Sequence, residues 1–281
     1  MKRHPIYLFA WYLVNCLLVL SILLAIYSIF WEYSTRRYLK GFSDAVVPLS
    51  APDAEKVDAI LTWMKLGPSR KIATDSLDYL IRDPTTTLNY QELLKTCGTA
   101  TNAFVNLANT SQLPSRRLLL MDKNGNVVHV VAEVQMNGRW VVVDPAFRTA
   151  FRDAHGQFLT RDELTDPNIL KQATEKLPDY LPEYTFDRTA HVRVARIPYI
   201  GNILRTDLSR GLPGWSDSLV WTFLLERESF AATVATLALV IFLLLIRLPL
   251  RWYGENRLGI QTLRAGKRFA QAAKTLLRGP I

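Results

Sequence analysis

The chain has 281 residues, of which 49% are hydrophobic and 21% charged, and its formal net charge is +9. This composition excludes a disordered protein, a collagen-like repeat and a coiled coil, and the length is sufficient for a core without disulfides or metals. The excess positive charge lies wholly in residues 1–31 and 229–281, while residues 32–228 carry equal numbers of basic and acidic side chains. Both basic ends adjoin long apolar runs. This pattern favours a membrane partner, and we find no recognition fold for nucleic acid.

Two apolar runs are long enough to be transmembrane helices. The first, residues 6–31, is uncharged and longer than the roughly 20 residues that cross a hydrocarbon core. A cleaved signal peptide is the alternative, but it would have a shorter apolar region and a small-residue cleavage site, which this run does not have. The second run, residues 229–246, is near the lower length limit for a span, and the alternative for it is a buried core helix. Tryptophan and tyrosine lie near the ends of both runs, as at membrane interfaces.

The basic residues set the expected orientation. Lys2 and Arg3 precede the first span and eight basic residues follow the second, so the positive-inside bias places both termini in the cytoplasm. We therefore expect a plasma or inner membrane protein whose residues 32–228 are periplasmic or extracellular. The predicted parts are a transmembrane helix (1–33), a juxtamembrane linker (34–50), a folded core (51–152), an irregular extension covering the core (153–228), a second transmembrane helix (229–250) and a basic amphipathic cytoplasmic tail on anionic lipid (251–281).

The outer domain begins with helical signals. Ser50-Ala-Pro-Asp53 is a helix start and Gly67-Pro68 a stop, and a shorter helical piece is expected over residues 75–81. Residues 96–109 place small and apolar side chains on one face, which predicts a helix with Cys97 in its first turn.

Three strand-like runs follow this helix, at residues 117–122, 127–136 and 139–144. They are separated by Asn124-Gly125 and Asn137-Gly138, which are strong hairpin signals. A helix followed by an antiparallel meander predicts an α+β domain. Beyond it, Thr160-Arg-Asp-Glu163 has the pattern of a capping box.

Cys97, His129 and Asp144 form the candidate site. The other cysteine, Cys16, lies inside the first span, so Cys97 should be a free thiol. At a helix start the amide dipoles lower the pKa of a thiol, although a free cysteine is also commonly an inert core residue. A two-residue turn at Asn137-Gly138 makes paired residue numbers sum to 275, so His129 and Asp144 become diagonal neighbours within reach of each other. The apolar set on alternate positions of this strand must pack on something, and the Cys97 helix is a plausible neighbour.

The order of these residues resembles a known family. Cys97-Gly98 at a helix start, Pro114-Ser-Arg116 before a strand, His129 in the next strand and Gly138-Arg-Trp to Asp144-Pro look like the transglutaminase-like superfamily of papain-like thiol enzymes, in a bacterial membrane-anchored member. The resemblance covers roughly residues 50–150. It implies a Cys-bearing helix packed on an antiparallel sheet, with Cys97 as nucleophile, His129 as base and Asp144 as the residue that orients the histidine. Gln91, six residues before Cys97, is a candidate oxyanion donor by analogy with papain-like peptidases.

The sequence therefore favours acyl transfer on amide bonds of an envelope protein, a peptide or a polysaccharide-assembly component. It leaves open whether the acceptor is water, as in a protease or amidase, or an amine, as in a transglutaminase. The alternative is a catalytically inactive scaffold in an envelope or exopolysaccharide assembly. We expect no cofactor and no metal, because His155 and His191 have no partners at a metal-ligand spacing, and surface or capping roles are predicted for both.

Overall fold

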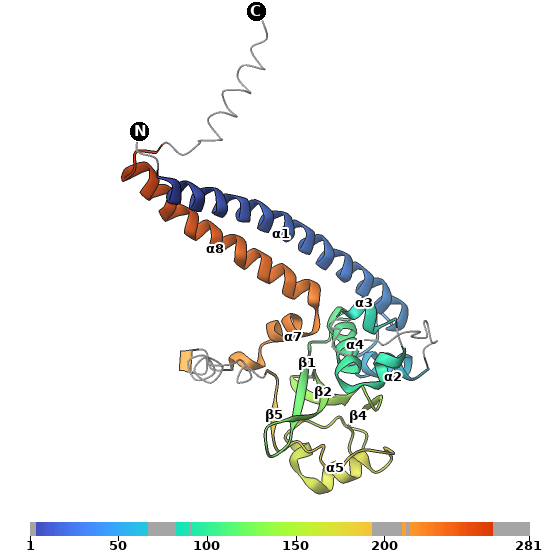
Figure 1. Ribbon diagram of the computed structural model, residues 1–281. Helices are drawn as coiled ribbons and strands as arrows, with labels where there is room; N and C mark the ends of the chain where they lie inside the picture. The colour runs from blue at the N-terminus through green and yellow to red at the C-terminus, as the bar shows by residue number, and fades with distance from the viewer. Residues whose placement is uncertain (1–3, 67–82, 90, 193–209, 212–213, 261–281) are drawn as a thin grey trace, which may run out of the picture. The chain divides into compact units, whose positions relative to one another are not determined.

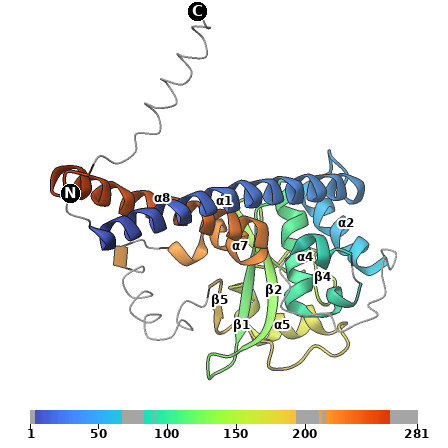
Figure 2. The same ribbon diagram turned by 45° about the horizontal axis from the view of Figure 1, so that its top comes forward.

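The computed structural model describes residues 4–66, 83–89, 91–192, 210–211 and 214–260. The chain divides into two compact units, and each is described by itself: one comprises residues 1–29 with 232–281, the other residues 30–231. Figure 1 shows the elements in chain order and Figure 2 shows them turned by 45°.

Two long helices correspond to the predicted spans. Helix α1 (Pro5–Val46) and helix α8 (Glu228–Asn256) are both long and apolar enough to cross a membrane, on length and composition. The two candidate membrane-spanning helices are thus present. The expected tail over residues 251–281 begins within α8, and its residues 261–281 lie outside the described residues.

A polar seam joins α1 and α8 within the first unit, where they lie side by side (Figures 1 and 2). The hydroxyls of Ser28 and Thr236 are 2.9 Å apart, and Arg247 Nε donates to Asn15 Oδ1 at 2.9 Å. Interhelical hydrogen bonds of this kind commonly stabilise the association of helices in lipid. Arg247, which directly follows the second apolar run, is therefore paired with Asn15, a polar residue inside the first.

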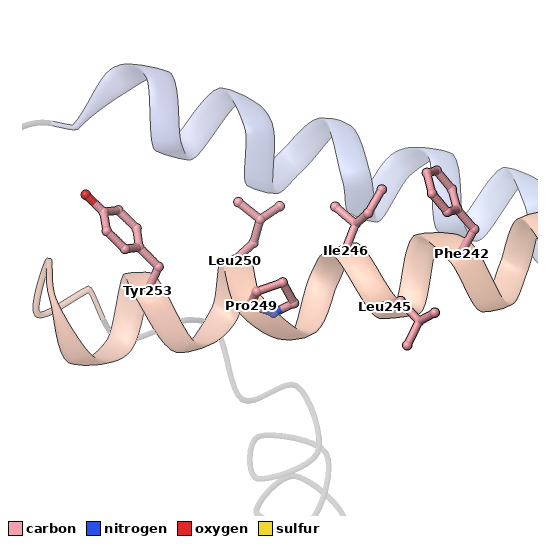
Figure 3. A pocket seen from close by; sticks show the side chains of 6 residues that line it. All are labelled: Phe242, Leu245, Ile246, Pro249, Leu250 and Tyr253. Carbon is pink, nitrogen blue, oxygen red and sulfur yellow. The ribbon is translucent and has the colours of Figure 1, made fainter.

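A groove lies beside Pro249 of α8 (Figure 3). Proline has no N–H and cannot bond the carbonyl of residue 245 in the helical pattern. The groove has a volume of about 470 Å³ and is lined by apolar side chains, together with one phenol: Phe242, Leu245, Ile246, Pro249, Leu250 and Tyr253. It offers no group suited to catalysis.

The predicted linker over residues 34–50 is wrong for most of its length, because α1 continues as a helix to Val46. Leu39 and Phe42 are buried against the core, and the Phe42 ring meets the Trp63 ring edge-on at 4.9 Å between centroids. Packing of this apolar face holds the segment helical. Two ion pairs at i,i+4 spacing also support it: Glu32 with Arg36, and Lys40 with Asp44.

The centre of the second unit is a five-stranded antiparallel sheet in the order β4-β3-β2-β1-β5. Its strands are β1 (Ser115–Met121), β2 (Val127–Met136), β3 (Arg139–Asp144), β4 (Thr149–Ala150) and β5 (Thr189–Ala190). The β2–β3 register runs from Met136 opposite Arg139 to Ala132 opposite Val143, as the turn predicted. Asn137 and Gly138 both have positive φ, which a type I′ turn requires. The α+β class with an antiparallel sheet is confirmed.

Helices α2 (Asp53–Leu66) and α4 (Cys97–Thr110) cover one face of this sheet. Ala132, Val134 and Met136 of β2 pack there, so the Cys97 helix is the neighbour of the apolar strand face. A register shift near Leu120 on β1 interrupts the alternation at the start of β2. Strict alternation would place Val128 on the same face as Ala132, but it packs on the opposite face for this reason.

The predicted extension is more regular than expected and covers the second face of the sheet. Phe151, Leu159, Leu164 and Phe186 are buried there against the strands. The capping box at Thr160 is present, since the Thr160 N–H donates to Glu163 Oε2 at 2.7 Å. The remaining short elements are α3 (Pro84–Thr87), η1 (Gln91–Lys95), η2 (Glu163–Thr165), α5 (Pro167–Thr174), η4 (Trp215–Asp217) and α7 (Leu219–Glu226). The helical piece expected over residues 75–81 lies outside the described residues.

Candidate functional site

Cys97 is the first residue of α4, where the sequence places it. Its side chain is half-buried. The preceding N-cap residue, Thr96, makes no side-chain capping bond, so the first-turn amides of α4 are not capped by it. Backbone amides at a helix start attract negative charge, and the Gly98 amide is one of the groups that lower the pKa of the Cys97 thiol. Thr101, one turn further on, donates its hydroxyl to the carbonyl of Val130 at 3.0 Å and fixes α4 against β2.

His129 of β2 and Asp144 at the end of β3 are hydrogen-bonded and almost fully buried. His129 Nε2 is 2.7 Å from Asp144 Oδ2, and the exposed fractions of the two residues are 3% and 0%. The other carboxylate oxygen of Asp144 accepts the N–H groups of Ala146 and Phe147, at 3.0 and 3.2 Å. These bonds fix the carboxylate, which in turn fixes the imidazole. The predicted diagonal pairing thus brings the two residues into direct contact.

The imidazole of His129 lies beside the thiol of Cys97, and each group shifts the pKa of the other through hydrogen bonding and charge. Since Nε2 faces Asp144, Nδ1 is the nitrogen available to the sulfur. The structure therefore brings all three predicted catalytic residues together in one line: thiol, imidazole and carboxylate.

The electrostatics of this line favour a thiolate and an imidazolium. Burial raises the pKa of the Cys97 thiol, but the hydrogen bond and charge of His129 and the N–H groups of Val130 and Gly98 outweigh burial and leave it below its ordinary value. Burial alone would lower the pKa of His129. The hydrogen bonds and charges of Asp144 and Cys97 overcome burial and raise it to about 9. Near neutral pH His129 is then an imidazolium, and the lowered pKa of Cys97 increases the fraction of the thiolate that nucleophilic catalysis by cysteine requires.

Aromatic rings from the extension and from the β3–β4 connection surround His129. The Tyr184 ring stacks on the imidazole with 4.3 Å between centroids and 10° between planes. Phe147 and Tyr180 approach its edges at 5.9 and 6.3 Å. Burial raises the pKa of the Tyr180 phenol, and no hydrogen-bond partner is present for its buried hydroxyl among the described residues. These rings restrict the access of water to the imidazole and strengthen its bond to Asp144.

The extension residues Tyr180 and Tyr184 were not found by the sequence analysis. The run from Leu177 to Tyr184 is rich in proline, tyrosine and acidic residues, and no local pattern shows that it returns to His129.

The prediction for His191 is wrong. It is buried, with Nε2 2.8 Å from Glu133 Oε2 and Nδ1 2.9 Å from Asp217 Oδ1. Glu133 also accepts from Arg116 Nε at 2.7 Å. Sequence reasoning missed this cluster because it joins β1, β2 and η4 over long separations. His155 is exposed, as predicted.

Two further predictions concern ligands. Gln91, the oxyanion candidate, is the first residue of η1, but its side chain lies outside the described part of the structure. Among the described residues no group of three or more histidine, cysteine or acidic side chains is arranged to hold a metal ion.

The fold and site define an α+β domain with a Cys-His-Asp line at the start of a helix and two candidate membrane-spanning helices. No protein-family model, curated protein or solved structure matches the chain.

Proposed function

We propose that the chain is a membrane-anchored thiol enzyme of the transglutaminase-like, papain-like type, which transfers acyl groups from amide substrates of the cell envelope. The observation that carries the proposal is the line of Cys97, His129 and Asp144, in which the imidazole is hydrogen-bonded to the carboxylate and lies beside the thiol. The lowered pKa of Cys97 increases the fraction of thiolate, which is the nucleophilic form of the side chain.

The proposed reaction has two halves. The Cys97 thiolate attacks the substrate carbonyl carbon, and the resulting oxyanion is held by backbone N–H groups at the start of α4, with Gln91 as a further candidate. Collapse breaks the carbon–nitrogen bond, and His129 gives its proton to the leaving amine. A thioester on Cys97 remains. Water or a second amine then attacks it, loses a proton to His129 and releases an acid or a new amide.

The anchoring part of the proposal places both termini in the cytoplasm and residues 32–228 on the outer face of the plasma or inner membrane. The basic residues that flank α1 and α8 support this orientation. A tethered enzyme of this kind suits a substrate that is itself fixed at the envelope: a protein, a peptide or a component of polysaccharide assembly.

Cysteine labelling tests the chemistry. In a Cys16→Ser background, we expect an iodoacetamide probe to label Cys97 at least tenfold faster than free cysteine at pH 7, because its lowered pKa increases the thiolate fraction. His129→Ala should reduce the rate to that of an ordinary thiol or below, and Cys97→Ser should abolish labelling. Equal rates for the parent protein and free cysteine would reject the enzyme and favour the inactive scaffold.

Reporter cysteines test the orientation. In a background of Cys16→Ser and Cys97→Ser, His155→Cys should react with a membrane-impermeant maleimide in intact cells, and Asn256→Cys should react only after lysis. Both native residues are exposed, so accessibility of the side chain does not limit either reporter. The reverse pattern would overturn the proposed topology.

A further inference from the structure

A cationic pocket lies within the second unit, between the outer part of α1 and the junction of α7 with α8. It has a volume of about 580 Å³. Its lining combines three cationic side chains, two polar ones and two phenylalanines: Arg36, Lys40, Arg227, Asn109, Thr110, Phe223 and Phe230.

The charges around this pocket do not balance. Arg227 is buried, and its Nη1 and Nε donate to Glu32 at 3.2 Å and to Asn106 at 3.1 Å. Arg36 Nε donates to the same Glu32 carboxylate at 2.6 Å, so two guanidinium groups share one carboxylate. Lys40 is paired with Asp44. In these contacts the three cationic side chains are therefore paired with only two carboxylates, those of Glu32 and Asp44.

The excess charge remains accessible. Arg36 uses Nε for its bond to Glu32 and keeps a side chain that is 61% exposed, and the Lys40 side chain is 59% exposed. Burial and the neighbouring Arg36 hold the pKa of Arg227 below its usual range, against the attraction of Glu32. The carbonyl end of α4 at Thr110 adds partial negative charge, which the three cations outweigh.

The pocket lies at the depth of lipid headgroups if α1 and α8 cross the membrane. Arg36 and Lys40 follow Trp31, at the end of the first apolar run, by five and nine residues. At ~1.5 Å per residue they lie roughly 7 and 13 Å beyond it, and helical side chains tilt back toward the helix N-terminus, which here is the membrane side. The headgroup layer extends about 5–8 Å beyond the hydrocarbon. Across the pocket, Arg227 and Phe230 flank the start of the second span.

The two phenylalanines give the pocket an apolar wall. The Phe223 and Phe230 rings are 5.9 Å apart, and Phe223 also lies under the Arg227 guanidinium at 5.3 Å. A free phosphate would leave these rings against water. A lipid would place its phosphate on the cations and its glycerol and first methylenes on the rings.

We propose that this pocket binds the phosphate headgroup of an anionic membrane lipid at the outer face of the bilayer. The inference rests on the proposed anchoring, which sets the depth of the pocket, and it is independent of the thiol chemistry. Binding there would seat the domain at a defined height above the membrane.

The test uses the full chain in an uncharged maltoside detergent, titrated separately with dioctanoyl-phosphatidylglycerol, dioctanoyl-phosphatidylcholine and inorganic phosphate. We expect phosphatidylglycerol to bind and the other two to bind at least tenfold more weakly. The double variant Arg36→Gln/Lys40→Gln should lose on the order of 25-fold in affinity for phosphatidylglycerol, since each basic group near an anionic lipid contributes about fivefold.

The matched control is Arg37→Gln/Arg161→Gln, which removes the same charge from cations outside the pocket. It should change the affinity by less than about twofold. Lys40→Gln alone, at an exposed position, should lose roughly fivefold in affinity for phosphatidylglycerol. This single variant replaces the double variant in the test if the double variant melts at a lower temperature. An equal loss in both double variants, no preference over phosphatidylcholine, or equal binding of inorganic phosphate would overturn the proposal.

The reporter cysteines in their own background, and Cys97 labelling in the Cys16→Ser chain, distinguish a failure of the proposed function from a failure of this pocket. Wrong topology or an unreactive thiol refutes the proposed function, whereas normal results there with no lipid preference refute this pocket alone.

Discussion

The Asp144→Asn substitution tests the site at its most buried residue. The amide oxygen of asparagine can still accept the N–H groups of Ala146 and Phe147, as Asp144 Oδ1 does. Its NH₂ group then points at His129 Nε2, which must become an acceptor. The imidazole proton moves to Nδ1, beside Cys97. Nδ1 can then no longer accept the proton of the thiol, and a second proton on Nε2 would break the bond to residue 144.

The magnitude follows from the raised pKa of His129. A value of about 9 instead of the ordinary 6.5 corresponds to roughly 3.4 kcal/mol in favour of the imidazolium. Burial opposes it, and Asp144 is the largest of the contributions that raise it. Removing its charge should therefore cost at least about 2 kcal/mol, or roughly 30-fold in the population of the thiolate–imidazolium pair. We expect a fall of that size or more in the iodoacetamide rate at pH 7.5.

The matched control is Asp217→Asn, which makes the same change in the other histidine–aspartate contact, at 2.9 Å from His191. Its labelling rate should equal that of the parent chain. Circular dichroism should be used to check that both variants are folded. A folded Asp144→Asn variant that labels as fast as the parent would refute the role assigned to the carboxylate.

Three further predictions concern the same site. The labelling rate of Cys97 should rise as pH passes through the lowered pKa of its thiol. Acyl transfer should fall above about pH 9, where His129 loses the proton that the leaving amine needs. Turnover that rises steadily to pH 10 would contradict this expected fall. Thr101→Val should lower the free energy of unfolding by about 1–2 kcal/mol in urea titrations, because the carbonyl of Val130 loses its donor, and Thr101→Ser should restore most of it. Tyr184→Ala should expose the imidazole, remove part of the burial that lowers the pKa of His129 and so raise that pKa in NMR titrations, whereas Tyr184→Phe should leave it unchanged.

The β2–β3 hairpin was predictable because its turn chemistry acts over a few residues. Asn137 and Gly138 fix the register, and the register carries His129 to Asp144 without any tertiary information. The position of Cys97 followed from the start of an amphipathic helix. These signals were sufficient for the three residues of the line.

The rest depended on contacts between distant segments. The helical continuation to Val46 is stabilised by packing of Leu39 and Phe42 on the core. The sequence of that segment, taken alone, is mostly polar and does not show which residues its apolar side chains contact. The cluster around His191 joins residues 58 positions apart, and the stacking of Tyr184 on His129 depends on the path of the whole extension. No local periodicity encodes either.

Glu32 has a further consequence for how the second unit, residues 30–231, can be handled. Its carboxylate holds Ser229 at 2.7 Å as well as Arg227, so residues 197 positions apart in sequence meet at the base of the domain. The two ends of this unit are thus already connected by side-chain hydrogen bonds. Its two cut ends would lie near one another after removal of both apolar helices, and a short peptide ligated between them would make a circular form of the unit.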